Sequence, residues 1–146
     1  MKNYAAIALL ACVAFATLGA TPSHAQVLMK AQVPFSFSAG ARTLPAGDYS
    51  ISETSMTPEV VLLSAGKRGV ELVMPNNTSS RSDVSSSKLI FHRYGDEYFL
   101  AEIWTNADDS VRTLAVSPRE RQLAKAPGVS PEVAVVYGLP SSTKGN

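Results

Sequence analysis

Cysteine is nearly absent from this chain of 146 residues, and its single copy, Cys12, lies in an apolar run close to the N-terminus. Lys2 precedes this run, and Ser23-His24-Ala25 follows it as the small-x-small pattern at which signal peptides are cut. We therefore expect residues 1–25 to form a signal peptide that is cleaved after Ala25. The mature chain is then expected to be secreted or periplasmic.

Without Cys12, the mature chain has no cysteine, which excludes disulfide bonds, a thiol nucleophile and cysteine-ligated metals. The alternative to cleavage is lipidation at Cys12, because residues 9–12 (LLAC) are similar to a lipobox. The apolar run covers residues 4–18, which is shorter than the roughly 20 residues that cross a bilayer. We expect no membrane span once the signal peptide is removed.

The mature chain also lacks an excess of either charge and has very little histidine. Loss of Lys2 leaves 12 basic residues against 12 acidic ones, which gives no electrostatic argument for binding nucleic acid. His92 is the only histidine that remains, so an ordinary zinc site is excluded. We expect neither a metal nor a cofactor.

Short apolar runs separated by turn signals occupy most of the mature chain and are typical of β-strands. We predict one β domain over residues 26–140, followed by a polar tail at residues 141–146. Its fold class is all-β, an antiparallel sandwich or barrel of about seven to nine short strands with one short helix before the last strand. The pattern does not decide between a sandwich with a filled core and a barrel with an open pocket.

Local signals predict the individual elements along the chain. We expect an extended run at 27–38 that is broken at Pro34, a strand at 48–54, a hairpin made by 60–64 and 70–74, a polar loop at 75–87, a strand at 111–116, a helix that starts at the capping box Ser117-Pro118-Arg119-Glu120, and a closing strand at 132–137.

The densest aromatic stretch is Lys88–Thr105, which reads KLIFHRYGDEYFLAEIWT. Gly95-Asp96 between its two apolar runs predicts a hairpin with a type II′ turn. The resulting register pairs Arg93 with Tyr98 and Leu89 with Glu102, and it places Trp104 on the same face as Arg93. His92 is predicted to lie on the opposite face.

Four hairpin residues are the candidate ligand-binding residues: Arg93, Tyr98, Trp104 and His92. An arginine flanked by aromatic rings can hold a carboxylate, a sugar or an aromatic ligand at the mouth of a barrel. The alternative is that Arg93 covers Tyr98 at the end of the sheet and that the aromatic residues belong to the core. His92 is either a packed histidine or the base of a hydrolase, and we assign no catalytic residue.

Three blocks of sequence carry a resemblance to a known family: VPFSF at residues 33–37, LPAGDY at residues 44–49 and FHRYGDEYFLAEIW at residues 91–104. The chain resembles a family of small secreted bacterial proteins with V-P-F-x-F, L-P-A-G-x-Y and F-x-R-Y-G-x-x-Y-F-L-x-x-I-W motifs. This resemblance implies a secreted β protein. It implies no activity and no catalytic residue, because the family has no assigned function.

Three hypotheses for function follow. The first is a secreted or periplasmic, non-enzymatic β domain that binds a small apolar or aromatic ligand, or a partner surface such as an envelope component. The second is a structural, envelope-associated protein without a small-molecule site. The third, a hydrolase, depends on His92 alone.

Overall fold

Eleven strands of one sheet occupy most of the residues that the computed structural model describes, which are 25–54, 57–66 and 70–141. A single α-helix lies among these residues, immediately before the last strand. The elements are β1 (Gln26–Val33), β2 (Phe37–Ala39), β3 (Arg42–Leu44), β4 (Gly47–Thr54), β5 (Thr57–Ser64), β6 (Val70–Val73), β7 (Pro75–Ser80), β8 (Lys88–Tyr94), β9 (Glu97–Thr105), β10 (Ser110–Leu114), α2 (Pro118–Ala124) and β11 (Glu132–Pro140). The predicted all-β class and the position of the helix are confirmed.

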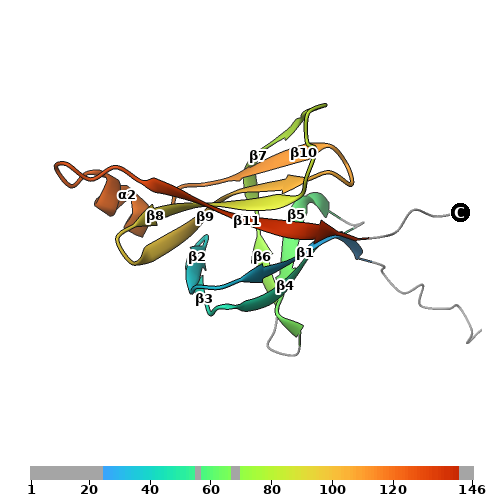
Figure 1. Ribbon diagram of the computed structural model, residues 1–146, viewed down its shortest axis with the longest axis horizontal. Coiled ribbons are helices and arrows are strands. Elements are labelled where there is room, and N and C mark those ends of the chain that lie inside the picture. Colours follow the sequence, from blue (N-terminus) through green and yellow to red (C-terminus); the bar gives the residue numbers. More distant parts are fainter. Residues whose placement is uncertain (1–24, 55–56, 67–69, 142–146) are drawn as a thin grey trace, which may run out of the picture.

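The sheet curls strongly into a half-barrel (Figure 1), so the barrel-like alternative describes it better than the sandwich. Its strand order is β3-β2-β9-β8-β11-β1-β4-β5-β6, and β10 joins β9 to β7. Neighbouring strands are antiparallel, except for one parallel pair between Ser38 of β2 and Phe99 of β9. Only Met74 separates β6, which pairs with β5, from β7, which pairs with β10. The segment from Val70 to Ser80 therefore links β6, at one end of this strand path, to the β7–β10 pair that branches from β9.

The inner face of the half-barrel is filled by apolar side chains. Phe37 is central, because its ring makes edge-on contacts with Tyr49 and Phe91 at centroid distances of 5.3 and 5.2 Å. Burial of each large apolar side chain contributes roughly 1.5–3 kcal/mol to stability. The fully buried residues include Met29, Val33, Phe37, Ile51, Val61, Leu63, Leu89, Phe91 and Ile103. The aromatic hairpin thus contributes to a packed core and does not line an open calyx.

Two close contacts fix the strands around β1. The Tyr49 hydroxyl donates a hydrogen bond of 2.6 Å to the carbonyl of Pro45, which anchors the turn at residues 44–47. Gly138 lets β11 approach β1 closely, since a Cβ atom there would lie 2.1 Å from Cε of the buried Met29. The Tyr49–Pro45 hydrogen bond gives the L-P-A-G-x-Y block at residues 44–49 a structural explanation.

The predicted polar loop at 75–87 is wrong in its first half. Residues Pro75–Ser80 form β7 and pair with β10, and the loop is confined to the residues that follow. No apolar alternation marks this strand, because Asn76 to Ser80 are all exposed. Strand β3 was also not predicted. The hairpin of residues 60–64 and 70–74 is confirmed as β5 and β6, whereas its basic tip at 67–69 lies outside the described residues.

The central hairpin forms β8 and β9, with Gly95 at a φ of +61° in its turn. The predicted pairs from Tyr94–Glu97 to Phe91–Leu100 are confirmed. Beyond them the prediction is wrong, because a bulge at Ala101 of β9, opposite Ile90 and Phe91, makes Leu89 face Ile103 instead of Glu102. An extra residue in one strand transfers all later side chains to the opposite face.

Residues 1–24, which make up all but the last residue of the expected signal peptide, lie outside the described residues. Within the part of the chain that is described, no helix is both long and apolar enough to cross a membrane.

Candidate functional site

Arg93 and Tyr98 lie together at the turn end of the central hairpin, as predicted. The Arg93 guanidinium carbon is 5.5 Å from the centroid of the Tyr98 ring, and Phe35 stacks on that ring at 3.8 Å. Arg93 Nε donates a hydrogen bond of 2.7 Å to the carbonyl of Gly95, and Nη1 lies 3.3 Å from the Glu132 carboxylate. The arginine already has partners on its own sheet, which matches the alternative in which it covers Tyr98.

Trp104 is separated from that pair, because the bulge places it on the outer face opposite Lys88. Its Nε1 donates a hydrogen bond of 2.7 Å to the Glu102 carboxylate, and the Lys88 ammonium lies 4.2 Å from the ring centroid. Arg81 approaches the same ring at 5.1 Å. The expected grouping of Trp104 with Arg93 and Tyr98 on one face is therefore wrong, and a ligand role for each of the three stays a prediction.

His92 lies on the outer face and joins the sheet to α2. Its Nδ1 is 2.7 Å from Oε1 of Glu120, whose side chain is only 5% exposed. The Ser117 hydroxyl accepts a hydrogen bond from the Glu120 amide, which confirms the predicted N-cap. Glu120 thus turns its carboxylate toward His92. Among the described residues, no hydroxyl or thiol is hydrogen-bonded to His92, so the histidine and glutamate are not accompanied by a nucleophile.

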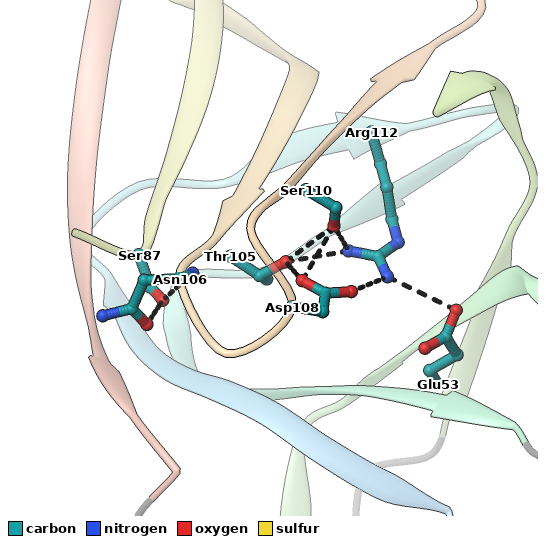
Figure 2. A network of polar contacts seen from close by, with 7 residues as sticks. All are labelled: Glu53, Ser87, Thr105, Asn106, Asp108, Ser110 and Arg112. Atoms are coloured by element: carbon teal, nitrogen blue, oxygen red, sulfur yellow. Dashed lines mark hydrogen bonds and ion pairs between the residues drawn. The ribbon is translucent and has the colours of Figure 1, made fainter. Parts of the chain in front are cut away.

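A polar network is buried where β10 faces β4 across the half-barrel (Figure 2). Arg112 is at its centre with a side chain that is only 3% exposed, and its Nη2 lies 2.5 Å from Asp108 and 3.3 Å from Glu53. Nη1 donates to the hydroxyls of Thr105 and Ser110. Arg112 Nε is buried and has no hydrogen-bond partner among the described residues.

The carboxyl group of Asp108 is held in its charged form by this network. Burial acts to raise its pKa, but hydrogen bonds from Arg112, Thr105 and Ser110, with the nearby guanidinium charge, outweigh burial and lower it. Both carboxylates that face Arg112 form ion pairs with its guanidinium. We therefore interpret the network as a structural ion cluster. No group of three or more metal-ligating side chains occurs in the described part of the chain.

A hollow of about 530 Å³ lies on the outer face of the sheet, away from the filled core. This volume falls in the range of small-ligand sites, roughly 300–1,000 Å³. One wall consists of Tyr137 and Leu139 of β11, whose exposed fractions are 69% and 75%. An adjoining hollow of about 420 Å³ shares Asp48, Tyr49 and Gly66 with the first.

The rest of the lining is mostly polar and comes from the outward-facing residues of β1, β4 and β5. The sheet register aligns Leu139, Lys30, Ser50 and Ser64 in one row across four strands. Gln32 faces Asp48 in the next row. These five polar side chains make no hydrogen bond or ion pair with other residues of the described chain: Lys30, Gln32, Asp48, Ser50 and Ser64. An apolar wall therefore meets a set of unused donors and acceptors.

This site was not predicted from the sequence, although β11 carried a signal. Residues Val133–Tyr137 are apolar at every position, so a strand with only one face on the core must expose part of the run. Val133 and Val135 extend the exposed apolar row toward His92, and the strand continues three residues past its predicted end to include Leu139. The polar residues of β1 and β4 gave no comparable signal, because alternation in a half-buried strand places polar residues outside in any case.

The fold and the hollow define a curled β half-barrel with a filled interior and a concave outer site. Comparison with known protein families, with curated proteins and with solved structures finds no match.

Proposed function

We propose that this chain is an exported, non-enzymatic binding domain that takes a small ligand in the outer hollow beside β11. The observation that carries the proposal is the hollow itself, where the highly exposed Tyr137 and Leu139 meet polar side chains that have no partner in the described chain. Large exposed apolar groups in a concave site are typical of ligand and partner surfaces.

Two further features support binding rather than catalysis. His92 is paired with Glu120 without an adjoining nucleophile among the described residues, and Arg112 is surrounded by its own carboxylates. Export rests on the signal pattern at residues 1–25 and on the resemblance to small secreted proteins, and both remain predictions.

Native mass spectrometry of the protein isolated from the cells that naturally produce it tests this proposal. We expect a small molecule to remain bound to the wild-type chain and to be lost from the variant Leu139→Ser. The matched control is Val133→Ser, which alters an exposed residue of the same strand outside the hollow. Equal retention by both variants, or a wild-type protein without any bound molecule, would contradict the proposal.

A structural role in the cell envelope is the second candidate, and Val133 and Val135 favour it. They extend the exposed apolar row of β11 beyond the hollow, where a small ligand does not explain them. This role predicts that the wild-type protein captures envelope components and carries no small molecule. Val133→Ser should lose this capture.

A further inference from the structure

The two walls of the hollow differ in chemistry, and this difference restricts the class of ligand. Tyr137 offers an exposed aromatic ring and Leu139 an exposed aliphatic group on one side. Beside them, the ammonium of Lys30, the amide of Gln32 and the carboxylate of Asp48 offer both donors and acceptors. A ligand that satisfies all of them needs an apolar surface and several uncharged polar groups.

The charges in the hollow argue against an ionic ligand. Lys30 and Asp48 supply one positive and one negative group, and the register separates them by two residues along neighbouring strands. A fatty acid could pair with Lys30, but its carboxylate would then lie near Asp48 and leave the hydroxyls of Ser50 and Ser64 without a use. A neutral ligand avoids repulsion from either group.

The polar groups are also spaced along the sheet. The row from Leu139 through Lys30 and Ser50 to Ser64 crosses four strands, and neighbouring strands are about 4.8 Å apart, so the row spans roughly 14 Å. A ligand that uses the whole row is therefore elongated and carries hydroxyl groups at intervals along its length. A linear oligosaccharide has this chemistry, because its hydroxyls both donate and accept and its ring C–H groups form apolar faces.

We infer that the hollow is a binding site for a neutral oligosaccharide, in which Tyr137 stacks on a sugar ring while Lys30, Gln32, Asp48, Ser50 and Ser64 bond its hydroxyls. This inference rests on the proposed function and specifies its ligand. The face of a tyrosine ring is well suited to such a contact because it is a rigid apolar surface, and the hydroxyl adds a polar tip.

Isothermal titration calorimetry with cellobiose, maltose and N,N′-diacetylchitobiose tests the inference on the mature protein. We expect at least one of the three to bind, and Tyr137→Ala to weaken it by about tenfold, equivalent to about 1.4 kcal/mol. Tyr137→Phe keeps the ring and is expected to bind within about threefold of wild type, since roughly 0.7 kcal/mol corresponds to that factor. The matched control is Val133→Ala, which should leave affinity unchanged.

Amide NMR spectra recorded with the same sugars locate the contact. The inference predicts shifts at Lys30, Ser50, Ser64 and Leu139, and unchanged resonances at the buried Leu89 and Phe91. If no sugar produces these shifts while sodium decanoate does, the saccharide inference is overturned and the hollow remains a ligand site. If neither produces them and the natively isolated protein carries no small molecule, both the inference and the proposed function are overturned.

Discussion

At the scale of single residues, Arg112 shows how this cysteine-free fold accommodates a buried charge. Its guanidinium connects Asp108, in the turn before β10, with Glu53 on β4, which lies 59 residues before Arg112 in sequence. Removing Arg112 leaves the partly buried carboxylates of Asp108 and Glu53, which are 31% and 23% exposed, without their shared counter-charge. This loss is more destabilising than that of a fully exposed ion pair.

Replacement of Arg112 by methionine is therefore expected to lower the free energy of unfolding by about 3 kcal/mol or more. Urea denaturation followed by circular dichroism measures this change. The control is Arg121→Met on the exposed side of α2, for which we expect a change below about 0.5 kcal/mol. A loss of less than about 1 kcal/mol for Arg112→Met would show that the network contributes little.

The lowered pKa of Asp108 makes part of this stability depend on pH. The pKa of an unfolded aspartate is about 3.9, and the pKa of the folded Asp108 is lower. The contribution is therefore complete above about pH 4 and is lost as the pH falls through the folded pKa. We expect the stability difference between wild type and Asp108→Asn to shrink in acid.

Denaturation at a series of pH values from neutral to acidic checks this expectation. Asp96→Asn, which removes a charge at the exposed turn of the central hairpin, is the control for a general charge effect. A difference between wild type and Asp108→Asn that stays constant with pH would contradict the assignment.

At the scale of elements, α2 is held to the sheet by polar contacts. Glu120 bonds His92, and Arg119 forms a 2.6 Å ion pair with Glu97, which lowers the pKa of that carboxyl. The first contact is the stronger anchor, because Glu120 is buried whereas Arg119 and Glu97 are exposed.

Glu120→Ala is expected to weaken the docking of α2 by about 1–3 kcal/mol, the usual effect of leaving a buried polar group without its partner. Hydrogen exchange at the backbone amides of residues 119–124 measures this local opening. Glu120→Gln retains an acceptor oxygen for His92 and should show a smaller increase in exchange. Equal protection in wild type and Glu120→Ala would indicate that other contacts hold the helix.

The same elements show which features a single sequence specifies. The start of α2 was predictable because Ser117, Pro118 and Glu120 act within one helical turn, and the Gly95 turn was predictable for the same local reason. The bulge in β9 was not, since it depends on bringing Ile103 rather than Glu102 into a core formed by distant strands. Strand β7 was missed because its pairing with β10 is made by the backbone and its side chains face solvent.

The candidate functional residues likewise include some that the sequence predicts and some that it does not. Arg93 and Tyr98 face each other as predicted from local pairing, whereas the Arg112 network and the hollow combine residues from strands far apart in sequence. Their assembly depends on the pairing of β11 with β1, which no local sequence pattern predicts. The continuous apolar run at Val133–Tyr137 was the one signal that could have indicated an exposed face.

At the scale of the whole molecule, the half-barrel has an apolar, filled interior, and the proposed binding site lies on its outer face. Phe37, Phe91 and Ile103 are almost fully buried in the interior, whereas the hollow lies beside the exposed Tyr137 and Leu139. The core and the proposed binding site are therefore located on opposite faces of one sheet. Substitutions in the hollow should change ligand affinity with little effect on unfolding.

The most direct test is to release the small molecule from natively isolated protein and to map its contact on isotope-labelled mature chain by amide NMR. We predict that the shifts cluster on β11, β1, β4 and β5 around Leu139, Lys30, Ser50 and Ser64. Shifts centred instead on the core residues Leu89, Phe91 and Ile103 would show that the ligand enters the interior of the half-barrel, and would contradict the outer hollow as the binding site.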